Sequence, residues 1–301
     1  MTDQHSSLPP GGEESPPFAL PGLDLAEFVR ATLAEDLGAE GDITSQAVIP
    51  AGARFRGVMA AREPIVVAGL PIAEAFFRAL DPNVAVAILA GEGQKVAAGS
   101  ELLRVAGLAR GLLTAERSAL NLVQHLSGIA TLTRQYVDAI AGTGAIVLDT
   151  RKTLPGLRRL EKYATRTGGA QNHRMGLWDA AMIKDNHVAV AGSIEAAARR
   201  AAQAGIARII VEVDSLDQIA PALAGGATHL LLDNMDSATL RAAVALVAGR
   251  VPTEASGGVT LETIRAKAQT GVTYISVGRI TQSAPAADIG LDFIADQDRR
   301  A

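Results

Sequence analysis

The sequence contains no cysteine and few aromatic residues. Among 301 residues, Phe, Trp and Tyr together make up 3%. The missing thiols exclude disulfides, thiolate metal sites and a cysteine nucleophile. The sequence also lacks an uninterrupted run of about 20 apolar residues suited to membrane insertion. Its first residues have neither the basic start nor the apolar stretch of a signal peptide. These features predict a soluble protein, and a cytoplasmic location fits them.

Charge of one sign does not dominate the chain either. The 28 Lys and Arg are set against 32 Asp and Glu, which gives a net charge of −4 and a sequence pI of about 5.8. A nucleic-acid-binding protein needs a broadly basic surface, so this balance argues against that class. What the chain does have is 48% hydrophobic residues over 301 positions. This length and composition allow a substantial core and two domains, although a single α/β barrel could also occupy this length.

The first 22 residues are rich in proline. Five prolines, at positions 9, 10, 16, 17 and 21, lie among Gly, Ser and Glu. Because this segment offers little to bury against its chain entropy, we expect residues 1–22 to be a disordered tail. Ordered structure is expected to begin with Asp24, the N-cap of a helix that continues at helical spacing to Gly38.

Short alternating segments predict an α+β domain over residues 23–128, to which residues from about 284 to 301 return, with a final strand expected over 284–293. Strands are expected at 53–61, 65–67, 84–89 and 102–105, around a helix at 72–80. The glycines and valines around Lys95 also suit the lysine hairpin of a biotinyl or lipoyl carrier. Lys95 has no neighbouring Met and precedes a strand, which favours an ordinary structural hairpin.

A long helical tract follows, and then a repeating pattern. Apolar residues recur at helical spacing from Leu112 to Ala141, and Gly128 is expected to divide this tract into two helices. From Ala145 onward, apolar strand runs alternate with helical segments of about ten residues, which is typical of a parallel sheet or barrel. We therefore predict an α/β barrel over residues 129–283.

Polar residues follow four of these strands at a steady interval. Steps of 21, 23 and 22 residues separate Glu212, Asp233, Ser256 and Gly278, so we expect them at equivalent places on successive units. In such barrels the carboxyl ends of the strands hold the active site. Acids in these places often cap the next helix instead. Two acids at one rim favour a site for hydroxyl groups or a divalent cation.

Two loops at the same rim consist of small residues. The segment Ser256–Gly258 precedes a helical stretch, and Val277–Arg279 forms a similar loop. Backbone N–H groups at such a helix start can hold a phosphate without hindrance from a Cβ atom. Each loop alone is a weak signal, but together they predict a phosphate site.

Basic residues are concentrated between Arg151 and Lys184, a segment that contains eight Lys or Arg and only two acidic residues. A solvated helix face is the ordinary explanation for such an excess. Here, however, Arg151 and Lys152 come at the end of an apolar run, and Lys184 ends another. His173 and Arg174 follow a Gly-Gly turn. Cations at strand ends converge, and a concave cluster of Arg, Lys and His suits a small ligand with several negative charges.

Three motifs of this segment resemble those of one enzyme family. They read TRKTLPGLRRLEKYA, GGAQNHRMGL and AAMIKDNH, and they are similar to motifs of quinolinate phosphoribosyltransferase, also called nicotinate-nucleotide pyrophosphorylase (carboxylating). The likeness extends from about Leu23 to the C-terminus. That family makes nicotinate mononucleotide, carbon dioxide and pyrophosphate from quinolinate and phosphoribosyl pyrophosphate in NAD biosynthesis. The resemblance implies an N-terminal α+β domain and an open α/β barrel of the type II phosphoribosyltransferase kind.

The resemblance also implies roles for residues. Catalysis would depend on Lys152, Lys184, Glu212 and Asp233, the two acids lying near the ribose hydroxyls and a Mg²⁺ ion held mainly by the substrate. Arg117 would reach the site of the neighbouring subunit in a homodimer or a larger assembly. The implied substrate-binding residues are Arg117, Thr150, Arg151, Lys152, His173, Arg174, Lys184, Glu212, Asp233, Ser256, Gly257, Gly258, Val277, Gly278 and Arg279.

Two features depart from the family's pattern, and two other functions stay open. An extra residue lies in the turn at Ala39–Glu40, and Arg279 is bulkier than the residue expected there. A paralogue of the same fold, found with molybdenum-uptake genes, would act on another acceptor, but its acceptor pocket differs from the motif around His173. A non-catalytic carrier or binding protein would depend on Lys95 or on the basic segment.

Overall fold

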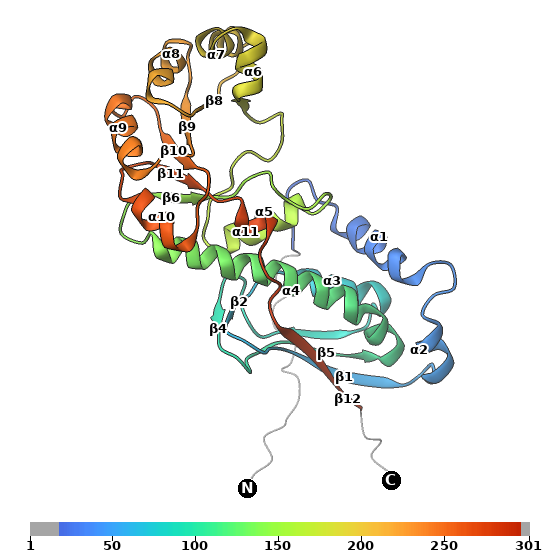
Figure 1. Ribbon diagram of the computed structural model, residues 1–301. Coiled ribbons are helices and arrows are strands. Elements are labelled where there is room, and N and C mark those ends of the chain that lie inside the picture. Colours follow the sequence, from blue (N-terminus) through green and yellow to red (C-terminus); the bar gives the residue numbers. More distant parts are fainter. Residues whose placement is uncertain (1–17, 296–301) are drawn as a thin grey trace. The chain divides into compact units, whose positions relative to one another are not determined.

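The computed structural model describes residues 18–295, and the chain divides into two compact units (Figure 1). One unit extends to Gly128 and resumes at Ala286, and the other comprises Ile129–Pro285. Most of the expected proline-rich tail, residues 1–17, lies outside the described residues. Its last part, residues 18–22, leads into a turn in which the Leu23 N–H donates to the Leu20 C=O.

The first unit combines an antiparallel sheet with helices, as expected for an α+β domain. The sheet has the order β12-β1-β5-β3, and β12 pairs with β1 from Phe55 to Ala61 (Figure 1). The strands are β1 (Arg54–Ala61), β2 (Ile65–Val66), β3 (Ala85–Ile88), β4 (Lys95–Val96), β5 (Glu101–Leu108) and β12 (Ile289–Ala295). The helices are α1 (Leu25–Leu37), α2 (Ile43–Val48), α3 (Leu70–Leu80) and the first part of α4 (Ala109–Ala139).

Local sequence explains where α1 begins and ends. Asp24 is its N-cap, and the Asp24 carboxylate accepts from the Glu27 N–H at 3.0 Å. Gly38 ends the helix with a φ of 50°, a value that glycine adopts without steric penalty. Both boundaries agree with the sequence prediction.

The expected break at Gly128 is wrong, because α4 is one continuous helix from Ala109 to Ala139. A glycine inside a helix costs about 1 kcal/mol relative to alanine. Here the neighbouring Leu126 and Ile129 are fully buried, and the Ser127 hydroxyl bonds the N–H and C=O of Ala68 at 3.0 and 3.1 Å. Packing and buried hydrogen bonds outweigh the local cost.

Lys95 lies within a strand. β4 pairs with β2 in antiparallel fashion, with Lys95 opposite Val66, and a turn at residues 92–93 precedes it. A carrier domain presents its lysine at an exposed hairpin tip, so this placement favours the structural hairpin.

The second unit is a parallel sheet of order β6-β11-β10-β9-β8-β7. The consecutive strands β6 and β7 therefore lie at opposite edges, which makes the unit an open α/β barrel. Its strands are β6 (Ile146–Leu148), β7 (Ala181–Ile183), β8 (Ile209–Val213), β9 (His229–Asp233), β10 (Thr253–Ser256) and β11 (Tyr274–Ser276). The helices are α5 (Arg158–Thr167), α6 (Asp185–Ala191), α7 (Ile194–Gln203), η1 (Leu216–Gln218), α8 (Ile219–Ala224), α9 (Ser237–Val247), α10 (Leu261–Ala268) and α11 (Arg279–Gln282). No helix within residues 18–295 combines the length and the apolar character needed to cross a membrane.

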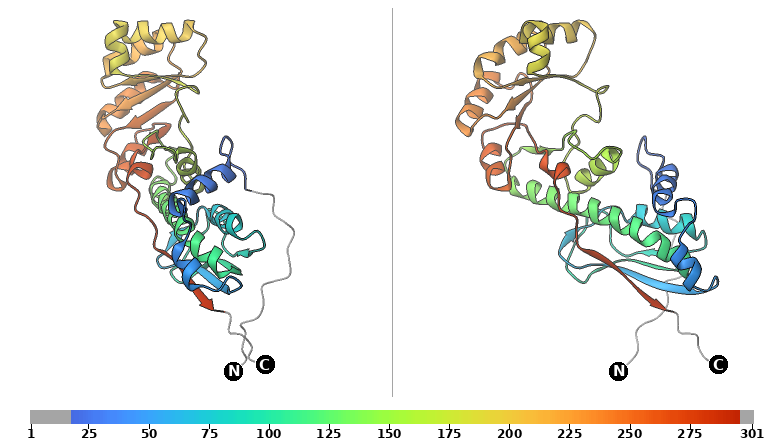
Figure 2. Two further views of the ribbon diagram at one scale, coloured as in Figure 1. Left: turned by 90° about the vertical axis from the view of Figure 1, so that its right-hand side faces the viewer. Right: turned by 45° about the vertical axis from the view of Figure 1, so that its right-hand side comes forward.

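The two faces of this sheet are packed differently. The outer face, with residues such as Val211 and Leu232, packs against helices α7 to α10 in one large apolar cluster. Figure 2 shows these helices, in yellow to red, along the outside of the sheet. The inner face carries a small cluster of Ala180, Ile210 and Leu231. The same face also carries the buried polar side chains of His229 and Glu254.

Candidate active site

A cavity of about 840 Å³ opens at the carboxyl ends of the parallel strands, a volume suited to small-molecule ligands. Most of the residues predicted to bind substrate line it, namely Thr150, Arg151, Lys152, His173, Arg174, Lys184, Glu212, Asp233, Ser256, Gly257, Gly258, Gly278 and Arg279. Val277 does not, because it is buried and its N–H donates to the Leu148 C=O at 2.9 Å. Arg117 is exposed on α4 in the first unit.

The predicted rim residues do not occupy equivalent places. Asp233 is paired with Ser256, but Glu212 is paired with Leu231, two residues before Asp233. Gly278 lies two residues beyond the end of β11. The expectation was wrong because a constant repeat length does not fix how residues are shared between strands and loops. A shift of two keeps Glu212 on the same face of the sheet as Asp233, but at a deeper level.

Two arginines meet in the cavity. Arg174 is 8% exposed, and its guanidinium donates to the Ala180 C=O at 3.2 Å. Burial lowers the pKa of Arg174, and the charge of Arg151 lowers it further. The Arg151 Nε is buried and has no hydrogen-bond partner in the described part of the chain. Two neighbouring positive charges and an N–H donor without a partner favour the binding of an anion. A carboxylate fits the planar fork of the arginine guanidinium.

Lys152 is held by its backbone, and its side chain lies against a glycine. The Lys152 N–H donates to Thr150 Oγ1 at 3.0 Å, and the Thr281 hydroxyl donates to the Lys152 C=O at 2.7 Å. A Cβ atom on Gly278 would lie 2.9 Å from Lys152 Cδ. The glycine therefore leaves the space that the Lys152 side chain occupies.

Lys184 and Glu212 form an ion pair between the end of β7 and the neighbouring strand β8. Lys184 is the N-cap of α6, and its N–H donates to His187 Nδ1 at 3.0 Å. The Lys184 side chain is 44% exposed, so solvent reaches the pair. The two charges neutralise each other, and an anionic ligand would compete with Glu212 for Lys184.

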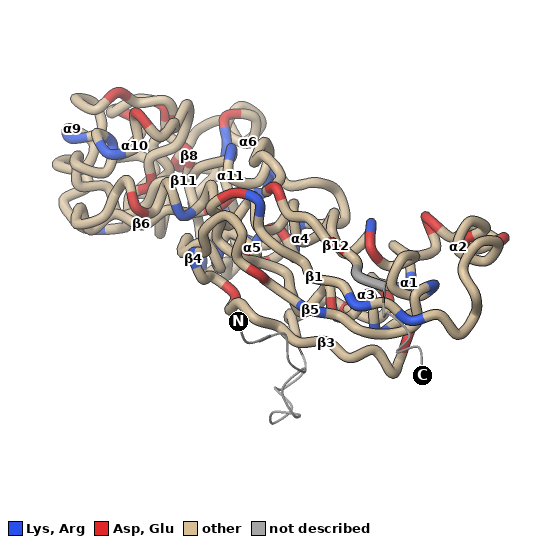
Figure 3. The backbone as a smooth tube through the Cα atoms, turned by 90° about the horizontal axis from the view of Figure 1, so that it is seen from below, with Lys and Arg blue, Asp and Glu red and all other residues tan. Residues whose placement is uncertain are grey.

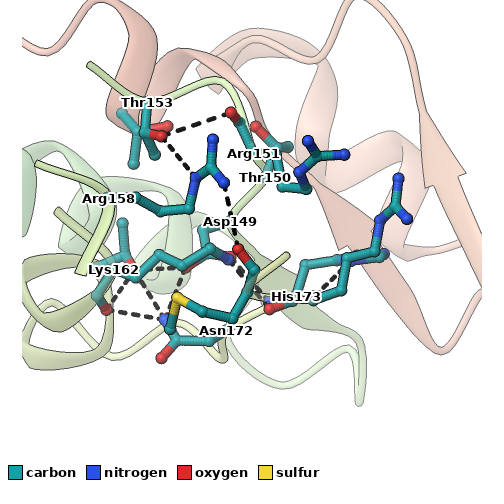
Figure 4. Close-up of polar contacts among 12 residues, drawn as sticks. Asp149, Thr150, Arg151, Thr153, Arg158, Lys162, Asn172 and His173 are labelled. Carbon is teal, nitrogen blue, oxygen red and sulfur yellow. Dashed lines mark hydrogen bonds and ion pairs between the residues drawn. The ribbon is translucent and has the colours of Figure 1, made fainter. Parts of the chain in front are cut away.

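A second, buried ion pair fixes the loop that carries His173. The Lys162 ammonium, on α5, pairs with the Asp149 carboxylate and donates to the His173 C=O at 3.0 Å. Asp149 also accepts from the Thr165 hydroxyl at 2.9 Å, the Asn172 amide at 2.6 Å and the His173 N–H at 2.8 Å (Figure 4). Burial lowers the pKa of Lys162, while Asp149 opposes that shift. Lys162, one of the eight basic residues counted in the sequence, is thus part of the scaffold.

The His173 imidazole uses both ring nitrogens inside the protein. Its Nδ1 accepts from the Arg174 N–H at 2.7 Å. Its Nε2 lies 3.2 Å from Glu254 Oε2 and donates to it. Contact between His173 and a substrate stays a prediction.

Glu254 is the acid that the sequence analysis missed. It is fully buried in the cavity wall, and its Oε2 also lies 2.8 Å from His229 Nε2. Burial alone would raise the pKa of Glu254, but hydrogen bonds from His173 and His229 outweigh burial and bring it to about 2. The sequence could have indicated Glu254, because it precedes the predicted site residue Ser256 by two positions and therefore lies on the same face of β10. The lining residues that were not predicted are Met182, Leu231, Asn234, Glu254, Val259, Ser276, Gln282 and Ser283.

Within the described residues, basic and acidic positions are interspersed along both units rather than collected in one block (Figure 3).

Two family models and many known proteins match most of the chain. The model described as quinolinate phosphoribosyl transferase, C-terminal domain, matches residues 129–292, and the corresponding N-terminal domain matches residues 42–127. Nicotinate-nucleotide pyrophosphorylase (carboxylating) of Mycobacterium leprae is 48% identical over 277 residues, which cover 89% of this chain and 96% of the relative. The probable enzyme of that name from Bacillus subtilis is 42% identical and covers 90% and 93%.

Solved structures agree with this grouping. Nicotinate-nucleotide pyrophosphorylase of Ehrlichia chaffeensis superposes with a TM-score of 0.87 at 39% identity, over 91% of this chain and 100% of that one. Matches to both domains, together with identity above 40% over nine-tenths of the length, leave one assignment. The chain belongs to the quinolinate phosphoribosyltransferase family.

Proposed function

We propose that the cavity of the second unit transfers a phosphoribosyl group from phosphoribosyl pyrophosphate to quinolinate and removes one carboxylate. The products are nicotinate mononucleotide, carbon dioxide and pyrophosphate. Family membership supports this reaction. The observation that carries it is the pair Arg151 and Arg174. Both line the cavity, the charge of Arg151 lowers the pKa of Arg174, and the buried Arg151 Nε has no hydrogen-bond partner in the described part of the chain.

Quinolinate is assigned to the arginine end of the cavity. Its two carboxylates stand on adjacent ring carbons, so they require donors from two directions. Arg151 and Arg174 offer planar forks, and Lys152 offers a mobile point charge. Charge-assisted hydrogen bonds contribute about 1.5–3 kcal/mol each. Several are therefore needed to offset the desolvation of a dianion.

Phosphoribosyl pyrophosphate is assigned to the small-residue loops. Gly257 and Gly258 have φ values of 86° and 58°, which only glycine adopts without strain. The loop can thus present backbone N–H groups to a phosphate with no Cβ atom in the way. Glu212 and Asp233 then face the ribose hydroxyls, and Lys184 is available to the pyrophosphate or to the departing carboxylate once its pair with Glu212 opens.

Mg²⁺ fits as a companion of the pyrophosphate. Glu212 and Asp233 supply carboxylate oxygens, which this ion prefers. Within residues 18–295, however, no three His, Asp or Glu side chains gather closely enough to hold a metal ion. The donor's phosphates would therefore supply most of its ligands. When bound, the ion neutralises charge on the leaving pyrophosphate.

The reaction proceeds in two stages. The bond from ribose C1 to pyrophosphate breaks, and pyrophosphate leaves with the electron pair. Glu212 and Asp233 stabilise the positive charge that develops on the ribose, and the lone pair of the quinolinate nitrogen forms the new bond to C1. The ring nitrogen is then positively charged, so it stabilises the electron pair left on C2 when carbon dioxide departs. C2 finally takes a proton, and no covalent enzyme intermediate is needed.

Arg117 is proposed to act in the cavity of a neighbouring subunit of a homodimer. It is exposed on α4 and does not line the cavity of its own chain. The family resemblance supports this role, since an exposed helical arginine by itself is usually a surface residue. Larger assemblies and the cytoplasmic location stay predictions.

The test is product formation by the purified protein with quinolinate, phosphoribosyl pyrophosphate and Mg²⁺. We expect equal amounts of nicotinate mononucleotide, by chromatography, and carbon dioxide, by release of a labelled 2-carboxylate. Nicotinate, which lacks that carboxylate, is the matched control and should be a poor acceptor. Absence of product from folded protein, or equal use of nicotinate, would contradict the proposal.

A further inference from the structure

Asn234 has an uncommon backbone conformation at the edge of the cavity. It directly follows Asp233 at the end of β9, and it lines the cavity. Its φ is 54°, and in the described part of the chain only Ala248 shares a positive φ among residues other than glycine. Asparagine tolerates the left-handed region better than most residues but still pays a steric penalty there. Such a residue beside an active site therefore calls for a reason.

The Asn234 amide is wedged between two neighbouring strands. Its Nδ2 donates to Asp233 Oδ2 at 2.6 Å, and its backbone N–H donates to the Ser256 C=O at 3.1 Å. Its Oδ1 lies against Gly257, where a Cβ atom would be only 2.0 Å away. A side chain at position 257 and the amide of Asn234 therefore exclude each other.

We propose that Asn234 is a positioning residue for Asp233, and that its amide, which occupies the place of a side chain at position 257, adds to the positive φ in requiring glycine there. A donor fixed to Oδ2 holds the plane of the Asp233 carboxylate and leaves Oδ1 for the ligand. This inference rests on the proposed function, in which Asp233 faces the ribose of the donor substrate.

A plain structural role makes a different prediction. The turn from β9 to α9 is short, because Asp236 already caps α9 by accepting from the Thr239 N–H at 2.8 Å. Such a turn could require a left-handed residue at position 234 whatever its side chain. Glycine would satisfy that backbone demand without an amide, so Asn234→Gly separates the two explanations.

The first measurement is steady-state kinetics of Asn234→Gly with each substrate varied in turn. The variant should unfold at the wild-type temperature or above, since glycine relieves the backbone penalty. We expect kcat/KM for phosphoribosyl pyrophosphate to fall about tenfold, the loss typical of a hydrogen bond to a charged group. KM for quinolinate should stay within about twofold, because Asp233 faces the other substrate.

The second measurement tests the contact with Gly257. Gly258 is the matched control, because it also has a positive φ but a Cβ atom there would meet nothing within 4 Å. In the wild-type background, Gly257→Ala should lower the unfolding temperature more than Gly258→Ala does. In the Asn234→Gly background this difference should shrink, because the clash with the amide is gone, while the backbone N of residue 234, 2.9 Å from the same Cβ position, remains.

Wild-type donor kinetics in Asn234→Gly would overturn the positioning role. Equal costs of Gly257→Ala and Gly258→Ala in the wild-type background would overturn the claim about position 257. A wild-type protein that makes no nicotinate mononucleotide would instead refute the proposed function, and the role of Asn234 with it.

Discussion

The buried carboxylate of Glu254 predicts how the second unit responds to acid. Burial alone would raise its pKa, but hydrogen bonds from His173 and His229 bring it from the ordinary 4.5 to about 2. At about 1.4 kcal/mol per pKa unit, this difference corresponds to about 3 kcal/mol of stability. Because the folded pKa is the lower one, the contribution is complete above pH 4.5 and is lost as pH falls toward 2.

Glu254→Gln removes the charge and keeps the shape of the side chain. We expect its free energy of unfolding, from urea denaturation at pH 7, to be lower than that of the wild type by about 3 kcal/mol. Between pH 6 and pH 3.5 the wild type should lose about 1.4 kcal/mol more than the variant. The control is Glu195→Gln, which removes an exposed ion pair with Arg199 on α7. It should change stability by less than about 1 kcal/mol and keep the wild-type pH dependence.

Two results would refute this reasoning. One is a Glu254→Gln protein as stable as the wild type at pH 7. The other is a parallel loss of stability in both proteins between pH 6 and pH 3.5. Either would mean that the charge of Glu254 is not what holds His173 and His229 in place.

Three further predictions concern the site and its support. Lys152→Ala or Lys184→Ala should reduce turnover by orders of magnitude with the unfolding temperature unchanged, and a wild-type rate in folded Lys152→Ala would remove that lysine from the mechanism. Mixing inactive Arg117→Ala with inactive Lys152→Ala should restore some activity through hybrid dimers, and no recovery would argue that Arg117 acts within its own chain or not at all. Gly168→Ala would place a Cβ atom 2.6 Å from the Ala130 carbonyl oxygen, so urea denaturation should show a loss of about 1–3 kcal/mol. Gly52→Ala, where a Cβ atom meets nothing within 4 Å, should change stability little.

The features predicted correctly from the sequence are those that depend on local chemistry. The ends of α1 follow from Asp24 and Gly38, whose effects act within a few residues. Arg151 and Lys152 lie three and four residues after β6 ends at Leu148, so their place at the barrel rim follows from strand direction.

The features that were missed depend on partners far away in the chain. Gly128 continues a helix because Ser127 bonds Ala68, and no local pattern encodes that contact. In the sequence, Lys162 cannot be distinguished from a surface lysine. Its burial depends on the ion pair with Asp149, which directly follows β6. Likewise, a constant interval between repeats does not fix which residues pair on neighbouring strands. The deeper position of Glu212 therefore becomes visible only in the pairing of Glu212 with Leu231.

The strand order has a consequence for how the enzyme is made. β6, which carries Arg151 and Lys152 at its end, pairs with β11, where Ile146 meets Tyr274. A ribosome finishes β6 long before β11, the last strand of the parallel sheet, is synthesised. Nascent chains that stop before Tyr274 therefore lack the strand that pairs with β6, and the cavity is completed late in synthesis.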